Sequence, residues 1–211
     1  MPKRMADEAF RIDQFERRYE KHVKRINRYA DWLTERDTSR VPYVAPHQGG
    51  VGARLLSLSS NPGPKTDSGF ISCENDDGSA ARMASLYEAA GISQTDTVPW
   101  NAYPWFIHDE LAGKGLDGTQ IAEGQRPLWK MIEMLRELRV VVLHGVDAQK
   151  AWAAIARAHG HDLWKRNVIT LPTIHTSNRV LTRDRDAKES ELAQVYSIAA
   201  QILSSPPKRC S

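Results

Sequence analysis

The chain has 211 residues, of which 41% are hydrophobic and 26% are charged, so it is long enough to bury a sizeable core as one domain. No apolar run approaches the ~20 residues that a membrane span needs, and the charged N-terminus has no apolar signal core. We therefore expect a cytoplasmic protein without a membrane partner. Cys73 and Cys210 are too few for a disulfide framework or a four-cysteine iron–sulfur site, and we expect no metal or other cofactor.

The net charge of +3 arises from 29 Lys and Arg against 26 Asp and Glu. The first forty residues hold eleven basic and eight acidic residues, so they account for the whole excess. A mildly basic chain is compatible with nucleic-acid binding, but charge alone favours a solvated helix face.

Apolar residues recur every three or four positions between residues 10 and 33, which predicts one amphipathic helix. Residues 40–50 are rich in Pro and Gly and are predicted to be loop. We expect a single domain over 1–211, with 1–45 as an N-terminal helical extension and 204–211 as a frayed tail.

Four short apolar runs predict strands at residues 53–58, 97–100, 140–143 and 168–172. Helical segments are expected between and after them, at 80–90, 119–138, 147–158 and 186–203, with Ser79, Thr119 and Asp147 as their N-terminal caps. This alternation predicts an α/β fold: a three-layer α/β/α sandwich around a central four-stranded, mainly parallel sheet, plus the N-terminal helix.

In such sheets, ligands bind beyond the carboxyl ends of the strands. Four segments occupy those positions, at residues 61–66, 101–105, 145–147 and 175–179. They are the places where we expect the chemistry of the protein.

Several residues near these ends have both a functional and a structural interpretation. Asn61 either positions a water molecule or forms an ordinary Asn-Pro turn. Asn101 presents an amide that matches a planar imide edge, or it is a turn residue among core aromatics. Phe70 either stacks on a planar ligand or packs in the core, and His175 is a catalytic or a structural histidine. Arg179 is placed to contact phosphate or DNA.

Common nucleotide and hydrolase motifs are absent from the sequence. There is no Gly-x-x-x-x-Gly-Lys-Ser/Thr phosphate loop, no Gly-x-Gly-x-x-Gly after a strand and no Gly-x-Ser-x-Gly nucleophile elbow. ATP or GTP chemistry, a dinucleotide site and a serine hydrolase site are therefore disfavoured.

Taken in order, the segments at the strand ends resemble the uracil-DNA glycosylase superfamily. The resemblance rests on NPGP at 61–64, SGF at 68–70, WNAYPW at 100–105, VVVLHGVDA at 140–148 and HTSNR at 175–179. The first segment is similar to that of the single-strand-selective and mismatch-specific branches, which carry no iron–sulfur cluster. The N-terminal helix is not accounted for by the resemblance.

The resemblance implies an enzyme that flips uracil out of DNA and hydrolyses its N-glycosidic bond, leaving an abasic site for base excision repair. It implies that Asn61 holds the attacking water and that His175 donates to the charge developing on the base. Asn101 would pair with uracil, Phe70 would stack on it, and Gly63 would lie beside it.

The implied partners are uracil-containing DNA, single- or double-stranded, and free uracil as product. Arg179 would contact the strand or fill the gap left by the base, while Ser177, Pro64 and Lys65 would also contact DNA. We expect a monomer that associates with the nucleoid through DNA.

Some positions depart from the pattern of the most active branch. Asn61 stands where that branch has an Asp, so another carboxylate is expected to assist, and Asp67 is a candidate. Gly63 stands where a Tyr blocks the thymine methyl group, so selectivity is expected to be broader. The alternatives are a glycosylase for hypoxanthine or xanthine, or a damage-binding protein that does not turn over.

Overall fold

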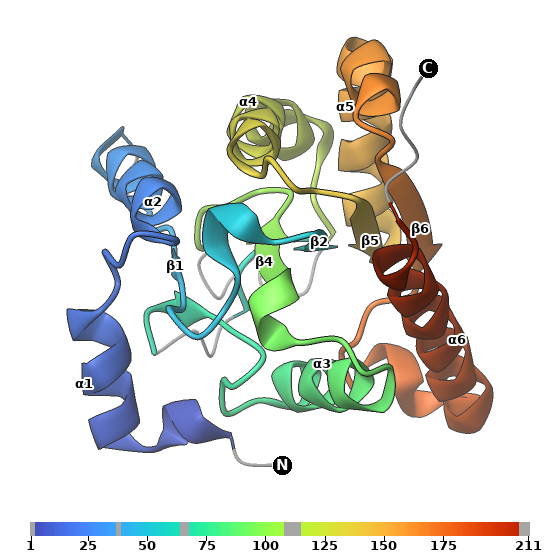
Figure 1. Ribbon diagram of the computed structural model, residues 1–211, viewed down its shortest axis with the longest axis horizontal. Coiled ribbons are helices and arrows are strands. Elements are labelled where there is room, and N and C mark those ends of the chain that lie inside the picture. Colours follow the sequence, from blue (N-terminus) through green and yellow to red (C-terminus); the bar gives the residue numbers. More distant parts are fainter. Residues whose placement is uncertain (1–2, 37–38, 64–67, 108–114, 207–211) are drawn as a thin grey trace.

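The computed structural model describes residues 3–36, 39–63, 68–107 and 115–206, with a four-stranded sheet at its centre (Figure 1). Its strands are β2 (Leu55–Ser59), β4 (Thr97–Asn101), β5 (Val140–His144) and β6 (Ile169–Thr173). They lie in the order β4-β2-β5-β6, and each neighbouring pair is parallel. The four predicted strands are confirmed.

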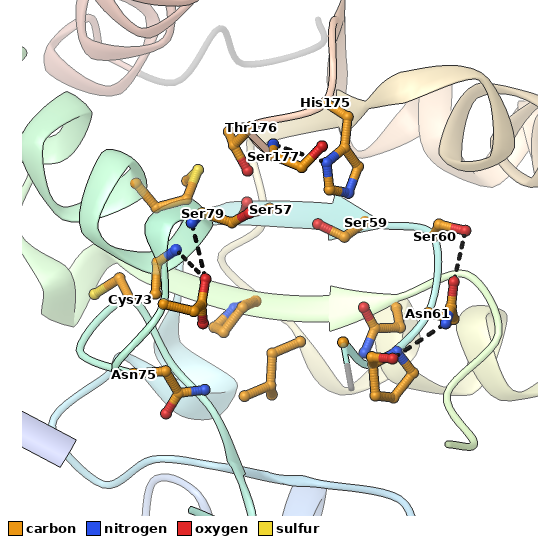
Figure 2. A pocket seen from close by; sticks show the side chains of 18 of the residues that line it. Ser57, Ser59, Ser60, Asn61, Cys73, Asn75, Ser79, His175, Thr176 and Ser177 are labelled. Atoms are coloured by element: carbon orange, nitrogen blue, oxygen red, sulfur yellow. Dashed lines mark hydrogen bonds between the residues drawn. The ribbon is translucent and has the colours of Figure 1, made fainter. Parts of the chain in front are cut away.

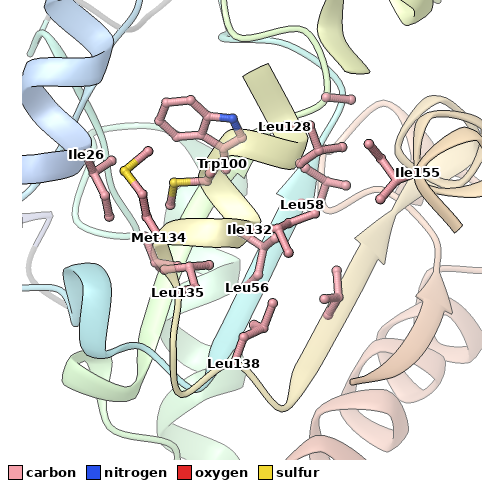
Figure 3. Close-up of a cluster of buried hydrophobic side chains, with 14 of the residues drawn as sticks. Ile26, Leu56, Leu58, Trp100, Leu128, Ile132, Met134, Leu135, Leu138 and Ile155 are labelled. Atoms are coloured by element: carbon pink, nitrogen blue, oxygen red, sulfur yellow. The ribbon is translucent and has the colours of Figure 1, made fainter. Parts of the chain in front are cut away.

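Helices cover both faces of this sheet. One face packs against α2 (Lys24–Arg36), α4 (Gly118–Met134) and α5 (Gly145–Lys165), and the other against α3 (Gly78–Ala89) and α6 (Arg185–Ser204). On the first face, Leu56 and Trp100 of the sheet meet Ile132 and Ile155 of the helices (Figure 3). All five residues of β5 are buried because both faces are covered. The predicted three-layer α/β/α sandwich is therefore confirmed.

The register of the strands brings their carboxyl ends to one edge. Ser59 pairs with Asn101, and His144 pairs with Thr173. The segments that follow each strand therefore start side by side, as the parallel arrangement requires. In the part of the chain that the structure describes, no helix has the length and apolar character to cross a bilayer.

The predicted helix caps need correction. Asp77, not Ser79, caps α3 and accepts hydrogen bonds from the backbone of Ser79 and Ala80. Asp117, not Thr119, caps α4 and forms a capping box with Gln120. In both cases an ionised carboxylate two residues earlier is the better acceptor for the first helical N–H groups.

The start of α5 also differs from the prediction. The helix begins at Gly145, directly after β5, with His144 at the N-cap position. Asp147 therefore lies within the first turn instead of capping it, and its side chain is directed to other partners. The helix runs to Lys165, past the predicted end, across a non-helical residue at His159.

The predicted single N-terminal helix is wrong, because the structure has two, α1 (Glu8–Glu16) and α2. A short 3-10 turn, Arg4–Ala6, precedes them. Between the helices, the Arg18 carbonyl accepts from the Asn27 side chain, and the His22 carbonyl accepts from the Val51 amide. Tertiary partners thus replace the i+4 hydrogen bonds that one continuous helix would need.

A small second sheet escaped the sequence prediction. It pairs β1 (Tyr43–Val44) with β3 (Phe70–Ile71) in parallel. The buried Asn27 side chain bonds both the N–H and the carbonyl of Val44. Strands of two residues are too short to leave a pattern in the sequence. This pair joins the N-terminal extension to the segment after the NPGP loop.

Candidate active site

A cavity of about 710 Å³ opens at the carboxyl edge of the central sheet (Figure 2). Residues within 57–63, 71–80 and 175–180 form its walls, together with Asn101 and Asp147. The size lies in the range typical of small-molecule sites. All four predicted strand-end segments thus contribute residues to one cavity.

His175 follows β6 and lines the cavity with its imidazole ring. Its Nδ1 accepts a hydrogen bond of 3.0 Å from the backbone N–H of Ser177. Burial lowers the pKa of His175, although the nearby Asp147 carboxylate opposes this shift. A neutral ring that accepts at Nδ1 carries its proton on Nε2. Figure 2 shows this second nitrogen directed into the cavity, over Ser59.

The backbone at Gly145 makes room for His175. Gly145 has a φ of +83°, and a Cβ there would lie 3.3 Å from the Cβ of His175. The left-handed backbone and the close approach both favour glycine. The turn from β5 into α5 therefore packs directly behind the histidine.

Asn61 lies in the loop after β2, and its amide nitrogen donates to the Pro62 carbonyl at 3.1 Å. The Ser60 hydroxyl lies 3.1 Å from the Asn61 amide oxygen and 2.9 Å from a carboxylate oxygen of Asp147. One hydroxyl proton serves one acceptor at a time, and a carboxylate is the stronger acceptor. The Asn61 oxygen is then left to accept from a water molecule.

Asp147 is the site residue that the sequence prediction missed. Its carboxylate accepts from the Ser60 hydroxyl and from the backbone N–H of Leu116, at 2.9 and 3.1 Å. Asp77 is the other described carboxylate lining the cavity, and it is engaged as the cap of α3. The sequence analysis singled out the segment at residues 145–147, but it assigned Asp147 to capping a helix.

Asn101 and Gly63 both line the cavity. Asn101 ends β4 and is 3% exposed, so its amide is held within the wall. No described atom comes within 4 Å of a Cβ placed on Gly63.

Phe70 does not line the cavity, which corrects the prediction that it stacks on a ligand. It is fully buried beside Met5 and Ala45, and its ring centroid lies 6.0 Å from that of Tyr43. Successive side chains of a strand point to opposite faces, so Ile71, the next residue of β3, faces the cavity instead. The core interpretation of Phe70 is the right one.

The loop after β6 is fixed to α3 by a single arginine. Arg82 donates to the carbonyl of Thr176 and, at 3.0 Å, to the side-chain oxygen of Asn178. Ser177 and Arg179, predicted to contact DNA, also line the cavity, and Arg179 is exposed. Arg82 carried no signal in the sequence, because it belongs to a helix face far from the motif.

Three predicted residues, Pro64, Lys65 and Asp67, lie outside the described residues. Within the described ranges, no group of three or more His, Cys, Asp or Glu side chains is arranged to hold a metal ion.

Fold and site together define an α/β protein with a cavity at the carboxyl edge of its sheet, where His175, Asn101 and Asp147 meet. The family model of the uracil DNA glycosylase superfamily matches residues 46–197. The chain therefore belongs to the uracil DNA glycosylase superfamily, as the motifs indicated. Membership makes it a DNA glycosylase of base excision repair, a class that hydrolyses N-glycosyl bonds of deaminated bases. A comparison with curated proteins gives no match.

Proposed function

We propose that this protein is a monofunctional uracil-DNA glycosylase. The proposal rests on three groups that line one cavity. They are the Nε2–H donor of His175, the amide of Asn101 and the amide oxygen of Asn61. A donor, a base-pairing amide and a water acceptor are the groups that hydrolysis of a uracil glycosidic bond requires.

Recognition of uracil is assigned to Asn101. Its amide accepts from the N3–H of uracil and donates to O4, whereas cytosine presents the opposite pattern. A buried amide left unpaired by the wrong base discriminates strongly against that base. The base reaches the cavity by flipping out of the DNA, which costs a few kcal/mol.

Catalysis is assigned to His175, Asn61 and Asp147. As the C1′–N1 bond breaks, its electron pair leaves with the base, and His175 donates a hydrogen bond to the developing charge on O2. A water molecule held by Asn61 adds its oxygen to C1′ and releases a proton. The Asp147 carboxylate offsets the positive charge of the sugar, in place of the acid absent from the NPGP loop.

The described lining of the cavity also favours direct attack of water on the sugar over attack by a lysine amine. Among its described lining residues there is no lysine that would form a Schiff base with the sugar. Arg179 and Ser177, at positions 175–180 of the wall, are assigned to the DNA strand and its phosphates. Pro64 and Lys65 belong to the same proposed DNA contact by their place in the sequence.

Gly63, which has no side chain and no described atom within 4 Å of a Cβ placed on it, favours a second candidate function, in which hypoxanthine or xanthine is the base removed. A cavity without a bulky side chain beside the base tolerates larger rings. Both candidates belong to the same reaction class, and they are separated by substrate.

We further propose that residues 1–211 act as one domain and as a monomer. The α2 residues Ile26, Ala30 and Leu33 belong to the same buried cluster as Leu58 of β2, which supports a single unit. An enzyme of this kind works in the cytoplasm, associated with the nucleoid through DNA.

The test is cleavage of labelled oligonucleotides that carry uracil in a single strand, opposite A or opposite G. Matched substrates carry hypoxanthine, xanthine or thymine, and alkali then cuts the abasic sites. We expect cleavage at uracil that is lost in His175→Ala and Asn101→Ala. His161→Ala, an exposed histidine of α5, serves as the control and cleaves as wild type does.

Other outcomes assign other functions. Cleavage at hypoxanthine or xanthine but not at uracil establishes the second candidate. Uracil-selective binding without any cleavage identifies a damage-binding protein on this fold and overturns the proposal.

A further inference from the structure

The loop that precedes β2 is held rigidly between two parts of the molecule. A Cβ on Gly49 would lie 2.1 Å from the Thr95 carbonyl oxygen, and one on Gly50 would lie 2.2 Å from the His22 carbonyl oxygen. The Gly49 N–H donates to the Thr97 carbonyl at 2.9 Å. Only glycine permits such close approach at both positions, and these contacts fix the backbone conformation beside Gln48.

Gln48 lines the cavity, is 1% exposed, and its side chain is unpaired. Neither its amide oxygen nor its amide nitrogen has a hydrogen-bond partner among the residues that the structure describes. The preceding residue differs, because His47 bonds both Gln14 and Ser72. Burial of an unpaired amide destabilises a protein, and such groups in native structures mark strain, a bound water or a function.

Gln48 lies at the inner end of the cavity. Ser57 and Pro99, which pair with each other, line the cavity two residues before the strand ends at Ser59 and Asn101. The cavity therefore reaches inward by roughly 7 Å along the sheet. Gly49 is bonded to Thr97, two residues further back on β4, which places Gln48 beyond Pro99.

We propose that the Gln48 amide recognises the flipped base by donating a hydrogen bond to the carbonyl of its lactam edge, which is an N–H beside a carbonyl. This inference rests on the proposed function, in which the glycosidic bond lies near Asn61 and His175 at the strand ends. The far edge of the base then meets the inner end of the cavity. A carbonyl oxygen has two lone pairs, so the Gln48 amide nitrogen donates to one while Asn101 donates to the other and accepts from the adjacent N–H.

The lactam edge is common to uracil, hypoxanthine and xanthine. Cytosine and adenine carry an amino group in place of the carbonyl, so they present the opposite donor and acceptor pattern. Gln48 thereby complements Asn101, and the two amides select deaminated bases as a class. A lactam carbonyl gives the Gln48 amide nitrogen the partner that it lacks, so this hydrogen bond forms only with a matching base.

The test uses Gln48→Leu, which keeps the approximate volume and removes the amide. We expect kcat/KM for the deaminated base that the enzyme prefers to fall by about tenfold to a hundredfold. The denaturation midpoint of Gln48→Leu is expected to equal or exceed that of wild type, because a buried unpaired amide is removed. Loss of activity without loss of stability separates recognition from a structural role.

Gln149→Leu is the matched control. Gln149 lies on α5, is not among the described residues that line the cavity, and donates to the Thr173 carbonyl at 3.1 Å. Its substitution is expected to leave cleavage unchanged and to lower stability slightly. Gln48→Leu cleaving within twofold of wild type, with the same base selectivity, overturns the inference and leaves the proposed function intact.

If the protein does not cleave DNA, a binding measurement tests the role of Gln48. Affinity is measured for oligonucleotides that contain uracil or hypoxanthine, against matched cytosine and adenine controls. Gln48→Leu is expected to lose at least tenfold of the wild-type preference for the deaminated base. A wild-type protein that neither cleaves nor prefers any deaminated base defeats the proposed function and this inference together.

Discussion

Asp147 changes the chemical interpretation of the site. The NPGP loop supplies Asn61, which does not accept a proton, and the structure brings a carboxylate from α5 to the same cavity. The Ser60 hydroxyl joins the two side chains. A negative charge near the cleaved bond stabilises a cationic sugar more in a partly buried site than in water. Position 147 thus supplies the charge that the loop lacks.

Asp147→Asn is predicted to lower the single-turnover cleavage rate by about a hundredfold, since the charge is lost while the amide oxygen still accepts hydrogen bonds. The thermal midpoint is expected to change little, because the contacts to Ser60 and Leu116 persist. Asp162→Asn, an exposed position of the same helix, is the control. A rate within threefold of wild type for Asp147→Asn would assign Asp147 to loop positioning alone.

At the scale of elements, the loop after β6 owes its shape to α3. Thr176 and Asn178 lie in this loop, whose HTSNR segment (175–179) has no proline to make the backbone rigid. Arg82 replaces this rigidity with hydrogen bonds to both residues. Gly78 packs against the same loop, since a Cβ there would lie 2.7 Å from the Asn178 amide nitrogen.

Arg82→Met is predicted to lower kcat/KM by about tenfold, because the loop that orients His175 loses two hydrogen bonds. The Ser177 amide, which donates to His175, is expected to exchange its hydrogen faster. Hydrogen exchange and cleavage kinetics provide the two measurements. Arg185→Met is a matched control, since both arginines contact Glu189. Equal exchange of the Ser177 amide in both variants would contradict this role for Arg82.

The N-terminal extension supports the cavity wall, although it lies outside the family match. Asn27 of α2 fixes β1, which pairs with β3 beside Ile71 of the wall. Arg4 forms an ion pair of 3.0 Å with Glu74. Residues 1–45 therefore belong to the structural support of the site and are more than an appended helix.

At the scale of the whole molecule, two histidines connect stability to pH: His144, which is buried, and His47, which is partly buried. Burial lowers the pKa of His47 to about 4 and that of His144 to about 3. His144 bonds the Tyr196 hydroxyl at 2.8 Å between β5 and α6. The unfolded chain takes up protons near pH 6.5, whereas the folded protein does not until the pH is much lower. Folding is therefore disfavoured as the pH falls below 6.5.

The free energy of unfolding is predicted to fall by about 2 kcal/mol for each of these histidines between pH 7 and pH 5. Urea denaturation at the two pH values measures the loss. His144→Phe is expected to be less stable at pH 7, because the Tyr196 hydroxyl loses its hydrogen bond to His144, yet to lose less stability on acidification. An identical pH dependence in His144→Phe and wild type would show that His144 contributes nothing to it.

The sequence by itself determined the central strands, their helical connections and the family. Continuous apolar runs such as 140–143 specify buried parallel strands, and parallel strands align their carboxyl ends. That rule was enough to locate Asn61, Asn101 and His175 around one cavity. These features depend on local pattern and on a general property of the fold, so they are encoded over short distances along the chain.

Only the tertiary structure decided which neighbours of these residues take part. Asp147 was predicted to cap a helix, whereas in the structure it accepts a hydrogen bond from Ser60, 87 positions away. Phe70 faces the core because pairing with β1 fixes its side of the strand. Gln48 is notable only because folding buries its amide without a partner. Each outcome depends on contacts between segments distant in sequence, which local patterns do not record.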